Sequence, residues 1–260
     1  MTYNGNGLIV SGSEKGNARK GGTYNQREIT RPWRASVERR AWLQELRQAA
    51  EEGYDEFGGT TYVEGPEEIT PTHHQFVARL IELCPPRARI LDAACGTGRY
   101  FGMILAAGHR VTGADQSAGM LARARARHPE ADTEKVGLQE LDFDARFDAV
   151  LCVDAMEFVF PEDWPLVLAN LCRALRSGGR LYLTVEQVTG REVEQAFATA
   201  SVQGLPVVRG ENILRGGYHF YPSSEQVTDW VRDAGLTTIE EAHSDHGSYG
   251  YYHLLAEKAG

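Results

Sequence analysis

A glycine-rich turn at residues 96–98 is the part of the sequence best suited to hold a ligand. The segment Arg89–Tyr100 reads as a short apolar strand that breaks into this turn and then opens a helix. Gly96 and Gly98 carry no Cβ, so the chain can turn sharply and a ligand can approach the backbone, facing the N-terminus of the next helix. Asp92 adds a carboxylate at the end of the strand. The pattern predicts a nucleotide-binding turn.

A second acidic residue, Asp115, follows the next predicted strand, residues 110–114. This is close to the spacing at which such folds place a carboxylate on a ribose diol. The dinucleotide fingerprint G-x-G-x-x-G is not met, because Phe101 stands where the third glycine would fall. That departure disfavours a nicotinamide cofactor, but an NAD-dependent oxidoreductase stays open as an alternative.

Together these residues resemble the class I S-adenosylmethionine-dependent methyltransferases. The usual motif of that family is an acid, a small residue, G-x-G and then an acid after the next strand, and Ala94 stands where the family most often has its first glycine. An alanine methyl fits there if the backbone keeps a negative φ. The resemblance runs from about Ile90 to the C-terminus and is most specific up to Val185. The other motif positions are occupied by Asp92, Gly96, Gly98 and Asp115.

The resemblance implies transfer of a methyl group from S-adenosyl-L-methionine to a small molecule, with an aromatic or specialised metabolite as one option and no metal. A protein that binds the cofactor without transferring its methyl, such as a regulator or a cyclase, is a further alternative. Family members often carry an acid beside the adenine ring where this chain has Gly137, so Gln139 is a candidate for the adenine amino group. The cofactor site that the resemblance implies consists of Asp92, Ala94, Gly96, Gly98, Asp115, Gln116, Leu138, Asp154 and Tyr62.

A general base is needed only if the acceptor arrives protonated. His219 is the first candidate, since its imidazole titrates near neutral pH and it lies in an insert rich in glycine and aromatic residues. A histidine in an aromatic cluster is also commonly structural. The second candidates are His73 and His74. The expected acceptor contacts are Glu157, Tyr218 and Tyr221, with helix capping or solvent contact as the other reading of Asp154 and Glu157.

Composition narrows the class of partner. The 260-residue chain has a formal net charge of −9, which argues against a surface that holds nucleic acid through clustered Lys and Arg. No apolar run is long enough to cross a membrane and no secretion signal is seen, so we expect a cytoplasmic protein. The four cysteines lie apart within apolar patterns, which predicts reduced, buried thiols: Cys84, Cys95, Cys152 and Cys172.

Strand and helix patterns alternate along most of the chain, which predicts an α/β fold with parallel pairing and right-handed connections. With the resemblance, this implies a doubly wound, mostly parallel, seven-stranded Rossmann-like sheet whose last strand is antiparallel. We expect residues 1–30 to form a flexible arm and residues 31–260 a single domain, with a helical cap at 35–84 and a lid insert at 187–222.

The element boundaries follow from the apolar spacing, the caps and the glycine and proline breaks. Beyond the first two, strands are expected near 135–136 and over 147–154, 180–185, 237–242 and 249–256. Helices are expected over 35–51, 72–83, 100–107, 164–175 and 223–234, with one more that Ser117 caps and one in the insert.

Overall fold

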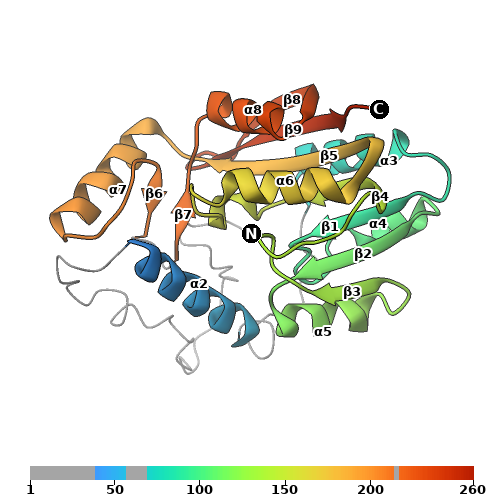
Figure 1. The fold of residues 1–260 in the computed structure, drawn as a ribbon, viewed down its shortest axis with the longest axis horizontal. Coiled ribbons are helices and arrows are strands. Elements are labelled where there is room, and N and C mark those ends of the chain that lie inside the picture. Colours follow the sequence, from blue (N-terminus) through green and yellow to red (C-terminus); the bar gives the residue numbers. More distant parts are fainter. Residues whose placement is uncertain (1–38, 57–68, 214–216) are drawn as a thin grey trace, which may run out of the picture.

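A computed structural model describes residues 39–56, 69–213 and 217–260 (Figure 1). The predicted arm at residues 1–30 and the candidate cofactor residue Tyr62 lie outside the described residues.

The described strands form a seven-stranded sheet in the order β3-β2-β1-β4-β5-β9-β8. All neighbouring pairs from β3 to β5 are parallel, and β9 runs antiparallel to both β5 and β8. The predicted fold class is therefore confirmed. The strands are β1 (Arg89–Ala93), β2 (Arg110–Asp115), β3 (Asp132–Lys135), β4 (Phe147–Cys152), β5 (Leu175–Gln187), β8 (Leu236–Asp245) and β9 (Gly250–Lys258).

Helices cover both faces of this sheet (Figure 1). Successive residues of a strand point to opposite faces, so Ile90 joins one apolar core and Leu91 the other. The core that contains Ile90 is closed by α3 (Pro71–Glu82), α4 (Phe101–Ala106) and α5 (Ala118–Arg127). The core that contains Leu91 is closed by α2 (Arg39–Glu56), α6 (Trp164–Ala174) and α8 (Ser224–Asp233).

Local sequence signals explain where several helices begin. The Ser117 side chain accepts a hydrogen bond from the backbone N–H of Met120 and so caps α5, as predicted. Thr189 with Glu192, and Ser223 with Gln226, form capping boxes at the starts of α7 (Gly190–Val202) and α8. These caps supply partners for backbone N–H groups that a helix start otherwise leaves open.

Two boundaries differ from the prediction. Strand β3 covers Asp132–Lys135 instead of 135–136, and it carries little apolar signal because it is a largely exposed edge strand. The Gly178-Gly179 pair does not separate helix α6 from strand β5, as the predicted gap between residues 175 and 180 implied. Instead β5 begins at Leu175, directly after α6, and its pairing with β4 shifts register between Phe147 and Ala149. Gly178, with φ +71°, lets the strand bulge there.

The helical cap and the insert also differ in detail. Helix α2 runs on to Glu56, past the predicted helix end at residue 51. The insert contains α7 and a short hairpin of β6 (Glu211–Asn212) and β7 (His219–Phe220). This hairpin lies near the N-terminal end of α2 (Figure 1). Strand β7 of the hairpin contacts η2 (Met156–Phe158), a one-turn helix after β4.

The strand order places a crevice at the centre of the sheet. The chain leaves β1 towards β2 and β3 on one side, whereas β4 and β5 lie on the other side. In open α/β sheets, ligands bind beyond the carboxyl ends of the strands at this kind of switch point. Asp92 at the end of β1 and Asp154 just after β4 flank it.

Candidate functional site

The turn after β1 leaves open space next to its backbone. Gly96 has φ +53°, and a Cβ built on it would have no atom within 4 Å. The Asp115 carboxylate accepts hydrogen bonds from the backbone N–H of Gly96 and of Ser117, each at 2.8 Å. It thereby joins the ends of β1 and β2, and burial raises its pKa. Three groups expected in the cofactor site, Gly96, Gly98 and Asp115, thus lie together.

Phe101 replaces the third glycine of a dinucleotide-binding turn, and its ring fills the space there. A Cβ on Gly113 of β2 would lie 2.4 Å from this ring and 2.7 Å from the Cys95 sulfur. A Cβ on Gly98, which has φ +78°, would lie 2.8 Å from the same ring. The glycines of this turn and of β2 therefore make room for a phenylalanine, which is an apolar packing arrangement between α4 and the sheet.

Ala94 does not have the negative φ at which an alanine is unstrained. Its φ is +61°, in the left-handed region that L-residues other than glycine, asparagine and aspartate seldom adopt. The expectation of a negative φ at this position was wrong. The tight turn demands a glycine-like backbone here, and the alanine bears the strain.

Asp92 is 2% exposed, and its Oδ2 atom has no hydrogen-bond partner among the described residues. Burial raises the pKa of its carboxyl to about 7, with the nearby Asp115 adding to the effect and Arg99 opposing it. A buried polar atom without a partner is costly. The unpartnered Oδ2 atom of Asp92 lies next to an open turn, as expected where a ligand donates a hydrogen bond.

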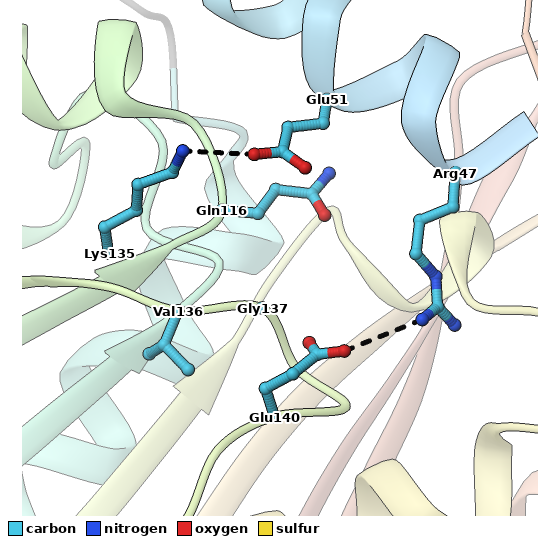
Figure 2. A pocket seen from close by; sticks show the side chains of 7 residues that line it. All are labelled: Arg47, Glu51, Gln116, Lys135, Val136, Gly137 and Glu140. Atoms are coloured by element: carbon cyan, nitrogen blue, oxygen red, sulfur yellow. Dashed lines mark hydrogen bonds and ion pairs between the residues drawn. The ribbon is translucent and has the colours of Figure 1, made fainter. Parts of the chain in front are cut away.

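A pocket of about 290 Å³ lies between the ends of β2 and β3 and helix α2 (Figure 2). Gln116, directly after Asp115, lines it together with Val136 and Gly137 after β3. From the helix side it is lined by Arg47 and Glu51, which the sequence analysis did not single out.

The loop after β3 brings an acid to this pocket from an unexpected position. The carboxylate of Glu140 lies over Gly137, with its Oε2 atom 2.5 Å from where a Cβ on that glycine would sit. The side-chain amide of Gln139 instead donates to Asp163 at 3.4 Å, away from the role expected for it. Asn170 of α6 binds the carbonyls of Leu138 and Gln139, which holds the loop in place.

Helix α2 is tied over this region by polar contacts near both ends. Asp55 accepts a hydrogen bond from the Ser117 hydroxyl at 2.7 Å and one from the Gly119 N–H at 3.2 Å. At the other end, Arg39 binds the carboxylate of Glu211, which is fully buried, and that of Glu162. Between them, Lys135 pairs with Glu51 at 3.1 Å (Figure 2).

Asp154 lies beyond β4, on the far side of the crevice from Asp115. Its carboxylate accepts hydrogen bonds from His73 Nε2 at 3.0 Å and from Arg99 at 2.6 Å. Burial by itself would raise the pKa of Asp154, but the hydrogen bond and charge of His73, with the charge of Arg99, lower it. Asp154 is therefore ionised at neutral pH. Its backbone has φ +52°, which is the left-handed conformation. His73 is buried, whereas His74, the other second candidate, is exposed.

Two further carboxyl groups, Glu157 and Glu186, face this part of the crevice. Glu157 is 2% exposed and its Oε2 atom has no hydrogen-bond partner among the described residues. Burial raises its pKa well above the ordinary value, and the charges of Asp154 and Glu186 add to that. The pKa of Glu186 rises to about 7, first through burial and then through Asp154. Glu186 was not expected from the sequence, since an acid in a strand pattern usually faces solvent.

Aromatic rings gather beside these acids. The His219 ring stacks on Tyr221, with centroids 5.8 Å apart, and lies 5.0 Å from the ring of Phe158. Burial lowers the pKa of His219 to about 4. Tyr218 points elsewhere: it is 8% exposed, its hydroxyl donates to Glu211 at 2.7 Å, and its ring packs on Phe160. The structure thus brings His219 and Tyr221 together and gives Tyr218 a contact inside the insert.

Other features of the described residues bear on the class of protein. The four cysteines are free thiols, and three of them are buried. Within residues 39–56, 69–213 and 217–260, no group of three or more His, Cys, Asp or Glu side chains is arranged to hold a metal ion. None of the helices in these ranges has the length and apolar character needed to cross a bilayer.

Known proteins share this arrangement. Residues 90–179, from β1 into β5, match the family model described as a methyltransferase domain. A ubiquinone biosynthesis O-methyltransferase of Xanthomonas axonopodis pv. citri is 28% identical over 187 residues, which cover 66% of this chain and 73% of that protein.

Solved structures show the same fold. One is 1,6-didemethyltoxoflavin-N1-methyltransferase of Burkholderia thailandensis with S-adenosylhomocysteine and its substrate bound (TM-score 0.56, 18% identity, covering 94% of this chain and 93% of that one). Another is the [4+2]-cyclase SpnF (TM-score 0.61, 18% identity, covering 82% and 96%).

The doubly wound sheet, the glycine turn after β1 and the acid after β2 define a Rossmann-like domain of the class that binds S-adenosylmethionine. Within that class, the family match over residues 90–179 and the sequence relatives support the assignment of the chain to the class I S-adenosylmethionine-dependent methyltransferases.

Proposed function

We propose that this methyltransferase acts on a small organic molecule in the crevice between the carboxyl ends of β1 and β4. The observation that carries the proposal is the turn at Gly96, open on its ligand side and joined by Asp115 to the end of β2. When bound there, the cofactor supplies a methyl group on a sulfonium, so the protein mainly has to align an acceptor with it.

Each part of the cofactor site has a proposed task. Asp115 holds the ribose hydroxyls, Gly96 and Gly98 let the backbone approach the cofactor, and Ala94 continues the turn. Asp92 offers its unpartnered oxygen to a hydrogen-bond donor of the ligand. Asp154 is proposed at the methionine end, where it is ionised and could accept from the amino group. Tyr62 remains proposed from the resemblance only.

The pocket beside Gln116 is proposed as the adenine end of the site. Val136 offers apolar surface to the ring, and Gln116 lies where it can contact an edge. Leu138, whose side chain is in the core, stays proposed for a contact through its backbone. We assign the adenine amino group to Glu140, because its carboxylate occupies the space over Gly137 and lines the pocket (Figure 2). Gln139, the earlier candidate, is engaged with Asp163.

The acceptor is proposed to lie beyond β4 and β5, against Glu157, Tyr221 and His219. His219 is neutral at pH 7 with a pKa of about 4, which makes it a weaker base than a free imidazole and favours packing against the acceptor over taking its proton. Tyr218 is proposed to brace the hairpin through Glu211 and not to touch the acceptor.

We also propose that the protein works in the cytoplasm as one domain with residues 187–222 as its lid, and that nucleic acid is not its substrate. Four free thiols are typical of a reducing compartment. The net charge of −9 gives a nucleic-acid backbone no favourable field.

Calorimetric titration with S-adenosylhomocysteine and, separately, with NAD tests the cofactor assignment. We expect micromolar or tighter binding of S-adenosylhomocysteine and none of NAD. Incubation of the pure protein with methyl-labelled S-adenosylmethionine and a metabolite extract then tests transfer. Tight binding of NAD alone would contradict the cofactor site, and binding of S-adenosylhomocysteine without labelling of any extract component would favour a non-methylating protein.

A further inference from the structure

The three acids beyond β4 and β5, which are Asp154, Glu157 and Glu186, differ in the donors that surround their carboxyl groups. The Asp154 carboxylate has two nitrogen donors within hydrogen-bond distance, one from His73 and one from Arg99. Glu157 and Glu186 have no such side-chain donor: in the described part of the chain no Lys, Arg or His forms an ion pair with either, and Glu157 Oε2 accepts no hydrogen bond. The protein therefore leaves two carboxyl groups unmatched at the centre of its proposed acceptor site.

The two glutamates lie on elements that contact each other, η2 and β5. Glu157 follows β4 on η2, and Glu186 lies near the end of β5, opposite Tyr251 of β9. Burial raises the pKa of the Tyr251 phenol, and the charges of Asp154, Glu157 and Glu186 add to that effect. The strand pairing and this shared influence both place the carboxyl groups near the ring of Tyr251, on the same side of the molecule as the ionised Asp154.

Unmatched carboxyl groups in a buried setting select for a particular ligand. An acceptor with an oxygen anion or a carboxylate would add negative charge next to Asp154, which is unfavourable at low effective dielectric. A nitrogen that carries protons would instead supply the missing donors and a positive charge. The ring of Tyr251, the strand partner of Glu186, lies beside the acids, and an aromatic face also attracts a cation.

We propose that Glu157 and Glu186 bind a protonatable nitrogen of the acceptor, which makes the protein an N-methyltransferase for an amine or a cationic N–H heterocycle. This inference rests on the proposed methyltransferase activity. Glu157 accepts a hydrogen bond from the nitrogen through its unpartnered Oε2 atom, and Glu186 takes the proton of the nitrogen.

The step balances with these two groups alone. The ammonium form of the acceptor gives one proton to the Glu186 carboxylate, which frees the nitrogen lone pair. That lone pair forms the new N–C bond with the methyl carbon as the S–C bond breaks, and its electron pair stays on sulfur. The product is a methylated ammonium beside a protonated Glu186, which returns its proton to water. The titration of Glu186 near neutral pH suits it to this exchange.

Paired probes test the inference by binding. The protein, saturated with S-adenosylhomocysteine, is titrated by calorimetry with phenethylamine and benzylamine and with the matching alcohols. We expect the amines to bind and the alcohols to bind far more weakly. Glu157→Gln and Glu186→Gln should each weaken amine binding on the order of 30-fold or more. Glu225→Gln, at an exposed position of α8, is the matched control and should change nothing.

Turnover separates the two glutamates. With labelled S-adenosylmethionine and a bound amine, Glu186→Gln should lower kcat about 100-fold or more as expected for loss of a base, whereas Glu157→Gln should act mainly through KM. The inference is overturned if no amine binds at millimolar concentration, if the alcohols bind as well as the amines, or if both variants keep the amine affinity. If S-adenosylhomocysteine itself does not bind, the proposed function is contradicted, and this is seen before any acceptor is added.

Discussion

Asp154 and His73 lie 81 positions apart in the chain, and the carboxylate of one accepts a hydrogen bond from Nε2 of the other at 3.0 Å. The second ring nitrogen of His73 contacts the Thr70 hydroxyl, and Thr70 also caps α3. A helix that precedes the whole sheet in sequence therefore positions an acid at the carboxyl end of β4. Because both ring nitrogens of His73 are engaged, we assign it the task of orienting Asp154 and not that of a base.

Asp115→Asn should weaken S-adenosylhomocysteine binding by about 1 to 3 kcal/mol, since the amide keeps only one acceptor oxygen for the ribose and the turn. Calorimetry measures this, and Asp142→Asn at an exposed loop position is the control. An unchanged affinity with an unchanged melting temperature would remove Asp115 from the cofactor site.

Ala94→Gly should stabilise the protein by about 0.5 to 1 kcal/mol, because glycine relieves the left-handed strain by more than it adds to the entropy of the unfolded chain. Ala93→Gly is the matched control, as Ala93 is the buried last residue of β1, and that change should destabilise. The denaturant midpoints of the two variants, compared with that of the natural protein, measure both effects. A destabilised Ala94→Gly variant would show that φ +61° carries no strain here.

Asp92 should make folding stability depend on pH. Its pKa rises from the ordinary value of 3.8 to about 7 in the folded protein, so between these values the folded state holds a proton that the unfolded chain has released. Stability therefore falls as pH rises across this window, by about 4 kcal/mol in all for this group. Asp92→Asn removes that loss. The difference in unfolding free energy between the variant and the natural protein should grow in favour of the variant from pH 4 to pH 7, and parallel pH curves would contradict the shift.

Arg39→Ala should destabilise the protein by about 3 to 5 kcal/mol, because it leaves the buried carboxylate of Glu211 without its ion-pair partner. Arg209→Ala breaks the exposed pair with Glu194 and should cost less than about 1 kcal/mol. Adding Glu211→Gln to Arg39→Ala should restore most of the loss. Equal effects of the two arginine variants on the urea midpoint would show that burial of Glu211 does not matter.

His219→Phe distinguishes two tasks for this ring. If His219 packs against the acceptor, as its pKa of about 4 favours, KM should rise and kcat should change little. A fall in kcat of about 100-fold or more would assign it the role of base. Glu225→Gln, at an exposed position of α8, is the control and should leave both parameters near their starting values.

The alternation of strands and helices along the chain and the glycine turn could be predicted because each depends on residues close together in the chain. Ser117 as a helix cap, the buried run of β4 and the acid after β2 are local signals of this kind. The edge strand β3 was misplaced because its four residues are mostly exposed and carry no apolar pattern. The bulge in β5 was mistaken for a break because Gly178-Gly179 is typical of both.

The contacts that complete the site could not be predicted, since they join distant segments. Arg39 meets Glu211 across 172 positions, and nothing near either residue indicates the other. Glu140 reaches the space over Gly137 only because the loop curls back, whereas sequence position suggested Gln139. The role of Glu186 depends on which face of β5 it lies on and on what packs there, and a strand pattern at the end of a sheet does not give this.

Helix α2 has charged contacts towards both ends and only two buried apolar side chains, Trp42 and Leu43, between them. Ion pairs at a partly exposed surface weaken as salt screens them, whereas burial of a tryptophan does not. If the pocket beside α2 receives the adenine ring, the charged contacts of this helix border the path by which the product nucleoside leaves. A higher salt concentration, which weakens these contacts, should then speed product release, and turnover should rise with ionic strength wherever release limits it.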